Sequence, residues 1–382
     1  ARDIADSTKT LDVDGGTIKL DGNYPVGTGN VALGNTALDS VEAGGTYNVA
    51  LGDAAGTAIT TGDGNVGVGA DALLLNSSGG YNTALGTSSV RNNTTGNYNV
   101  GLGQGALYSN TTASNNTAVG YQALFDNTTA ERNTAVGRLA AANTTTGADN
   151  TAMGSAALTT NTTGANNIAI GASALRLNTT ASNNTAVGFE AGYANTGDKN
   201  TFVGNEAGVA NTSGRLNTML GRRAGKSNTT ASSNTFVGQA SGETNTTGQY
   251  NTALGDQSLQ SNTTASRNTA VGYQALYSQT TAQGGYNTAV GYRAGYTGNG
   301  YYNTHIGYTA GNISTGYRGT FIGHGAGNSI TTGNGNTIIG TYNGNSVGLD
   351  ITTSSNNIVL SDGDGNPRFT IDGSGDAELR GL

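Results

Sequence analysis

Two histidines, His305 and His324, are the only imidazole groups that the chain offers for acid–base chemistry. Both fall inside copies of a repeated segment, and no serine elbow, phosphate-binding loop or closely spaced pair of histidines accompanies them. Carboxylates for glycoside hydrolysis are spread thinly between residues 30 and 344. The sequence therefore predicts no catalytic residue and no cofactor, and we expect a protein that is not an enzyme.

An acidic turn near the C-terminus, Asp362-Gly-Asp-Gly-Asn-Pro367, places oxygen ligands at positions 362, 364 and 366, as the start of a calcium loop does. An EF-hand needs Gly where Pro367 stands and a bidentate Glu where Gly373 stands. Cys is absent, so thiolate metal sites and disulfides are excluded. We interpret the segment as a plain β-turn and predict no metal site.

Tyrosines are concentrated between residues 286 and 317, which hold seven of the eighteen in the chain. Aromatic rings with a polar tip suit recognition surfaces, including those that bind sugars. The candidate binding residues are Tyr292, Tyr296, Tyr301 and Tyr308. A structural interpretation competes, because Tyr also stands before the repeat at positions 47, 81, 98 and 250, as stacked rings at one turn would require.

The element that must position all these residues is a tandem repeat, of which Asn116-Thr-Ala-Val-Gly120 is one copy. Nineteen copies end on a Gly between Gly34 and Gly340, and thirteen of the eighteen intervals between those glycines are 17 residues. A segment of that length cannot enclose a core by itself and must stack on its neighbours. The sequence therefore predicts an all-β parallel β-solenoid of about nineteen coils.

Within each repeat, counted from its Asn, the fourth position is always Val, Leu, Ile or Met, and the eighth is Ala in fifteen copies. We predict that these two positions form the coil interior. Asn fills the first position in eighteen of nineteen copies and is predicted to form a ladder from coil to coil. A helical repeat is disfavoured, since 63 Gly would each cost roughly 0.5 to 1 kcal/mol in a helix.

Composition limits the partners. The net charge of −7, with no cluster of Lys and Arg, argues against nucleic acid, and no run of 18 apolar residues predicts membrane insertion. We divide the chain into an N-terminal cap or attachment segment at 1–29, the repeat array at 30–344, and a C-terminal β-hairpin segment at 345–382. The acidic N-terminal segment is expected to protect an open edge of the solenoid.

The third and ninth positions of the repeat exchange volume. A large third residue goes with Gly at the ninth position, as for Phe236 with Gly242, whereas Leu at the ninth goes with Ala or Gly at the third. Such exchange indicates one shared, close-packed compartment. With the fourth residue placed inside, the third points outward, so we expect it to be covered by other chains. The predicted interface residues are Phe202, Met219, Phe236, Phe321 and Ile338.

The motif Asn-Thr-Ala-Val-Gly followed by x-x-Ala-Leu or x-x-Ala-Gly resembles the head repeats of trimeric autotransporter adhesins and, more closely, bacteriophage tail-fibre proteins. The resemblance covers about residues 30 to 344. It implies a left-handed parallel β-roll and three chains in one fibre. The segment from Asn357 to Phe369 is similar to one that precedes a self-cleaving chaperone in many phage fibres, which implies that such a chaperone was removed after Leu382.

The expected function is a structural and adhesive fibre, in the virion as a tail fibre or at the bacterial cell surface as an adhesin. Its expected partners are two further copies of itself, a host cell-surface receptor such as a glycan, and a baseplate or other fibre protein at the N-terminus. An ice-binding solenoid is the alternative, because pairs such as Thr94-Thr95 and Thr111-Thr112 recur regularly.

Overall fold

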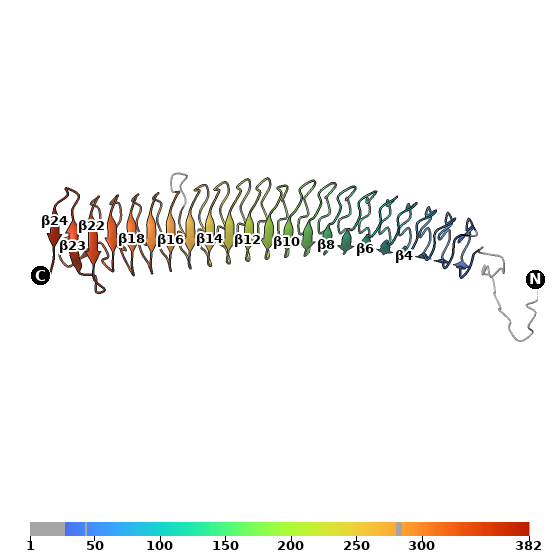
Figure 1. Ribbon diagram of the computed structural model, residues 1–382, viewed down its shortest axis with the longest axis horizontal. Helices are drawn as coiled ribbons and strands as arrows, with labels where there is room; N and C mark the ends of the chain where they lie inside the picture. Colours follow the sequence, from blue (N-terminus) through green and yellow to red (C-terminus); the bar gives the residue numbers. More distant parts are fainter. Residues whose placement is uncertain (1–26, 43, 280–284, 382) are drawn as a thin grey trace, which may run out of the picture. The chain divides into compact units, whose positions relative to one another are not determined.

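The computed structural model describes residues 27–42, 44–279 and 285–381, and it contains strands and turns but no helix within those ranges. Each repeat forms one coil of a β-solenoid and contributes one short strand (Figure 1). The predicted all-β solenoid of about nineteen coils is thus confirmed. The chain divides into two compact units, residues 1–163 and 164–382. The predicted N-terminal cap lies almost entirely outside the described residues.

The N-terminal unit holds eight strands of three residues each, one per coil. Consecutive strands are parallel and in register, so that Ala118 pairs with Ala135 and Val119 with Val136. The strands are β1 (Val31–Leu33), β2 (Val49–Leu51), β3 (Val66–Val68), β4 (Thr83–Leu85), β5 (Val100–Leu102), β6 (Thr117–Val119), β7 (Thr134–Val136) and β8 (Thr151–Met153).

The C-terminal unit continues the pattern with parallel strands in the same register. They are β9 (Ile168–Ile170), β10 (Thr185–Val187), β11 (Thr201–Val203), β12 (Thr218–Leu220), β13 (Thr235–Val237), β14 (Thr252–Leu254), β15 (Thr269–Val271), β16 (Thr288–Val290), β17 (Thr304–Ile306), β18 (Thr320–Ile322) and β19 (Thr337–Ile339).

Beyond β19 the parallel order gives way to hairpins. A small antiparallel pair, β20 (Asn345–Ser346) and β21 (Leu349–Asp350), precedes β22 (Ile358–Ser361), which is the last parallel strand and pairs with β19. Strands β23 (Pro367–Ile371) and β24 (Ala377–Leu379) then add antiparallel to β22 and to each other. The parallel array thus ends in a three-stranded antiparallel edge.

The coil interior is the reverse of the one predicted for the strand. In β6, Ala118 at the third position is fully buried, whereas Thr117 and Val119 on either side are half-buried and face outward. The same alternation holds for every strand from β1 to β19. The prediction that the fourth position is interior was therefore wrong, since neighbouring strand residues point to opposite faces. The eighth position, Ala123 in this coil, is buried as predicted.

The shared compartment of the third and ninth positions exists, but it lies inside one chain. The ring of Phe202 fills it so closely that a Cβ added to Gly208 would stand 2.3 Å from the Phe202 Cδ1 atom. Met219 and Phe236 meet Gly225 and Gly242 in the same way. The five residues predicted at a chain interface are 0 % exposed in a single chain, so that prediction was wrong for Phe202, Met219, Phe236, Phe321 and Ile338.

The compartment also extends into the preceding coil. Gly192 follows a small third residue, Ala186, and so has no large partner in its own coil. A Cβ at Gly192 would lie 2.5 Å from the Cδ2 atom of Phe202, which belongs to the next coil. Gly295 stands in the same relation to His305, with the imidazole Nδ1 at 2.6 Å. A large third residue therefore requires Gly at the ninth position of two successive coils.

Two internal ladders of Asn hold the coils together. The Asn116 side-chain oxygen accepts a hydrogen bond from the Asn133 backbone N–H (2.9 Å), and the Asn116 amide donates to the Ala130 carbonyl (2.9 Å). At the twelfth position, the amide of Asn127 donates to the side-chain oxygen of Asn110 (2.9 Å). These residues are fully buried, so their bonds offset the desolvation of polar groups in the interior.

Candidate functional site

The outward face of the strands carries two regular columns. Thr occupies the second position of the repeat, which is the first residue of each strand, in register from β10 to β19, as in the pairs of Thr235 with Thr218 and Thr252. The fourth-position aliphatic residues form the other column, in which Leu220 is 45 % exposed and Leu254 is 48 % exposed. A column of half-exposed aliphatic side chains that recurs over ten successive coils is unusual for a monomer.

The four predicted binding tyrosines do not form one site. Tyr292 and Tyr308 belong to a stack that runs from Tyr273 to His324, with neighbouring ring centroids 5.0 to 5.4 Å apart. Tyr296 stacks on Tyr277 in a second column. Tyr301 is in neither of these stacks and pairs with Tyr317 instead. Because the ring faces within a stack cover one another, these columns present ring edges and phenol groups rather than open faces.

The last position of the repeat, which precedes the first Asn, carries the third column. Tyr250, Arg267, Tyr286, Tyr302 and Arg318 occupy it in five successive coils, and we call these five residues the Tyr–Arg column. The Arg267 guanidinium carbon lies 5.5 Å from the Tyr250 ring centroid and 5.1 Å from that of Tyr286. Its Nη1 donates a hydrogen bond of 2.7 Å to the Tyr286 hydroxyl.

Two flanking residues, Tyr301 and Tyr317, link the members of the second half of the column. The Tyr286 and Tyr302 centroids are 5.0 Å apart, and the edge of Tyr302 meets Tyr301 at 5.4 Å. Tyr301 stacks on Tyr317 at 5.0 Å, and the guanidinium of Arg318 lies over the Tyr317 ring. Tyr301 is thus the one predicted binding residue that the structure joins to this surface.

Sequence reasoning missed the arginines of this surface, although the sequence contains a signal for them. No Asp or Glu occurs between Asp256 and Asp350, while the same stretch holds Arg267, Arg293 and Arg318. None of these three takes part in an ion pair among the described residues. A chain with a net charge of −7 therefore carries a local excess of positive charge here.

The two histidines are held apart by their positions in the coil. His305 is a third-position residue, buried inside its coil and stacked on Phe321 at 5.2 Å, and neither ring nitrogen has a hydrogen-bond partner. Burial lowers the pKa of His305 to about 4. His324 is exposed at the end of the tyrosine stack. No catalytic pair is formed by these residues.

The acidic turn at 362–366 closes on itself. The Asp362 carboxylate accepts hydrogen bonds from the backbone N–H groups of Asp364 (3.0 Å) and Asn366 (2.9 Å), and Arg368 Nε donates to it at 2.9 Å. Bonds from Asn366, with support from Arg368, lower the pKa of Asp362 to about 2. The carboxylate thus serves the turn that joins β22 to β23. Within the described ranges, no group of three or more His, Asp and Glu is placed to hold a metal.

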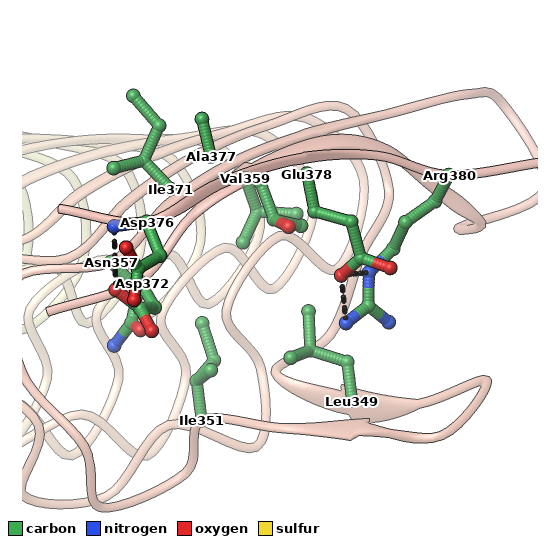
Figure 2. Close-up of a pocket in the computed structure, with 11 residues that line it drawn as sticks. Leu349, Ile351, Asn357, Val359, Ile371, Asp372, Asp376, Ala377, Glu378 and Arg380 are labelled. Atoms are coloured by element: carbon green, nitrogen blue, oxygen red, sulfur yellow. Dashed lines mark hydrogen bonds and ion pairs between the residues drawn. The ribbon is translucent and has the colours of Figure 1, made fainter. Parts of the chain in front are cut away.

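A cavity of about 260 Å³ lies at the C-terminal end of the array, between the β20–β21 hairpin and strands β22 to β24. Figure 2 shows Leu349 and Ile351 pointing from the hairpin side toward Val359. At its rim, Arg380 is paired with Glu378 at 2.7 Å. Of the residues that line this cavity, Ile351 and Val359 belong to one buried hydrophobic cluster, and Leu349 packs against it. The cavity is therefore an uncovered last layer of the solenoid interior.

Comparisons with protein-family models, with curated proteins and with solved structures found no match. In the part of the chain that the structure describes, no helix is long and apolar enough to cross a membrane. The candidate functional surfaces are therefore identified by their geometry alone: the outward strand face, and the Tyr–Arg column beside it.

Proposed function

We propose that this chain is a structural and adhesive fibre protein, of the type that forms bacteriophage tail fibres, and that it works as a homotrimer. The observation that carries the proposal is the aliphatic column on the outward strand face. In water, each half-exposed Leu, Ile or Val of that column is disfavoured by roughly 25 cal/mol per Å² of apolar surface. Association of three chains along this face would cover the column in every coil.

The interior supports the same function, because coils that bond and pack only with their immediate neighbours can be stacked to any length. Through the Asn ladders and the volume exchange, the buried groups of each coil contact only that coil and its two neighbours. An array of stacked coils suits a part that holds a receptor-binding surface away from a particle. We place it in the virion, attached at its N-terminus to a baseplate or another fibre protein, and contacting a host cell-surface receptor. A bacterial trimeric surface adhesin is its near relative in function.

The test is the mass of the native chain by light scattering, together with a charged variant of the outward face. Leu220→Asp with Leu254→Asp is expected to give a folded monomer, because both side chains lie on the strand face and leave the interior intact. The matched control is Thr247→Asp at an exposed turn, which should keep the native mass. A stable monomer for the unmodified chain would contradict the proposal.

Ice binding is a second candidate, and the column of Thr residues favours it. The Thr pairs noted in the sequence lie at a turn, where the Thr94 hydroxyl donates to the Thr111 carbonyl and is therefore engaged internally. The second-position Thr column of β10–β19 is instead a regular array on a β-face, with about 4.8 Å between neighbouring rows. Thermal hysteresis of a purified monomer would favour ice binding, and its absence would exclude it.

A further inference from the structure

We propose that the Tyr–Arg column binds an anionic glycan through the edges of its stacked planar groups. The inference deepens the proposed function and rests on it for the biological setting, since it names the chemistry of the receptor. The surface consists of Tyr250, Arg267, Tyr286, Tyr302 and Arg318, flanked by Tyr301 and Tyr317.

The first support is the geometry of the guanidinium groups. The guanidinium carbon of Arg267 lies between the Tyr250 and Tyr286 rings, 5.5 Å and 5.1 Å from their centroids, and the side chain is exposed. An oriented guanidinium edge matches the two oxygens of a carboxylate, sulfate or phosphate. Among the described residues, Arg267 Nη1 donates to the Tyr286 hydroxyl, and no other hydrogen bond engages its guanidinium.

The second support is charge. At the same repeat position in the N-terminal unit, Arg132 is neutralised by Asp149 of the following coil, with Nε to Oδ1 at 2.7 Å, and by Glu131 at 2.9 Å. The corresponding partners of Arg267 and Arg318 are Tyr side chains, and the chain supplies no carboxylate between Asp256 and Asp350. Among the described residues, the column thus keeps two exposed positive charges that no carboxylate pairs.

The third support is the backbone. Every residue of the column has a left-handed conformation, with φ between 59° and 62°. Asn tolerates that conformation best among side-chain-bearing residues, and it fills the same position at Asn115, Asn166 and Asn183. Bulky Tyr and Arg in five successive coils are therefore not what the turn itself favours, which points to selection for what the side chains contact.

The kind of partner follows from these features. Covered ring faces do not favour the stacking of a neutral sugar, whereas phenol hydroxyls and guanidinium edges recur at the strand spacing of about 4.8 Å and offer hydrogen bonds to hydroxyl and acidic groups alike. A polysaccharide that bears acidic groups supplies both. Carboxylate, sulfate and phosphate share this chemistry, and separate probes distinguish them.

The experiment measures binding of the full chain to immobilised polygalacturonate, heparin and a phosphate-bearing teichoic acid, with neutral dextran and double-stranded DNA as comparisons. We expect binding to at least one acidic polysaccharide that weakens with salt, and no binding to dextran. The variant Arg267→Gln with Arg318→Gln should bind at least about tenfold more weakly. The matched control, Arg132→Gln, removes a paired charge from the same repeat position outside the Tyr–Arg column and should bind as the native chain does.

The proposal is overturned by native-like binding in the double variant, by equal binding to dextran, by equal binding to DNA, or by no binding to any acidic polysaccharide. Circular dichroism of each variant verifies that the fold is kept, and Arg267→Lys with Arg318→Lys, which keeps the charges but not the planar edges, should recover only part of the affinity. Light scattering on the same samples separates the two proposals. A monomer that binds refutes only the trimer, and a trimer that does not bind refutes only the glycan site.

Discussion

Coils with Leu at the ninth position and coils with a large third residue fill the same compartment from opposite sides. In the coil of Ala118, the Leu124 side chain occupies the interior, whereas in the coil of Phe236 the ring enters from the strand and Gly242 leaves room for it. Strand register does not change where the two types meet, since Phe236 pairs with Ala253 as Ala253 does with Ala270. The backbone and its Asn ladders set the dimensions of the coil, and the side chains share a fixed volume.

The largest expected effect comes from converting one type of coil into the other in two steps. Phe236→Ala leaves a cavity and should cost about 3 to 5 kcal/mol. Gly242→Leu places a side chain against the Phe236 ring, whose atoms lie 2.7 Å from a Cβ there, and should cost about 1 to 3 kcal/mol or more. The double variant recreates the Ala118 and Leu124 arrangement and should recover most of the loss.

Hydrogen exchange of the amides around β13 reports the local free energy of opening for each variant. The difference between the double variant and the sum of the single variants measures the coupling of the two positions. Additive costs would mean that the two residues do not share one compartment. We call a coil with Leu at the ninth position a leucine-type coil. The reverse swap in such a coil, Ala118→Phe with Leu124→Gly, is not an equivalent control, because the preceding coil carries Leu107 where Gly is required.

A smaller effect is expected from His305, the one large third-position residue that is polar. Because burial lowers its pKa from 6.5 to about 4, the folded chain binds a proton less readily than the unfolded chain does. The free energy of unfolding should therefore fall as the pH drops from about 6.5 to 4, by on the order of 3 kcal/mol in total. His305→Phe should remove this dependence and stabilise the coil, since Gly295 and Gly311 already accommodate a ring.

Denaturant unfolding of the native chain and of the His305→Phe variant at several pH values between 7 and 4 tests this expectation. The carboxylates of the chain contribute equally to both, so only the difference between the two curves is informative. A difference that does not grow toward low pH would show that His305 is not neutral and buried in the folded state.

The smallest effect should be the same in both types of coil. Asn116→Ala leaves the Asn133 N–H without its acceptor and removes one of the two hydrogen bonds to the Ala130 carbonyl, which Asn127 still contacts. Asn234→Ala does the same to the Asn251 N–H and to the Gly248 carbonyl, which keeps its bond from Asn245. Each loss should cost about 1 to 3 kcal/mol. Unequal costs in thermal unfolding of the two variants would show that the ladder depends on how the interior is filled.

The repeat period, the turn formers and the volume exchange were sufficient to predict the solenoid and its compartment. They were not sufficient to decide which strand face is inside. Hydrophobicity favours Val119 over Ala118 for the interior, but a thin coil that already contains Leu124 has room only for Ala at that point. A size limit set by the residue at the ninth position thus overrode the hydrophobic pattern.

The tyrosines show a similar limit. Their concentration was visible in the sequence, but a count of residues does not reveal which of them share a column. Tyr292 and Tyr296 differ by four positions and lie in different columns, whereas Tyr286 and Tyr302 are adjacent in space because each is the last residue of its coil. The absence of acidic residues from 257 to 349 was equally visible. That absence indicates unpaired positive charge only once the structure shows that neighbouring coils place Arg beside Tyr rather than beside Asp.

Phe202 requires a glycine in the preceding coil. This requirement limits how the gene can gain or lose repeats. Tandem repeats in DNA gain and lose copies through unequal recombination, and each event joins coils that were not neighbours before. Joining two leucine-type coils leaves the interior unchanged. An event that placed the coil of Phe202 directly after the coil of Leu175 would drive its ring into the Leu side chain, since Gly192 would be lost. Length variants should therefore arise freely among leucine-type coils and be excluded at the junction that Gly192 protects.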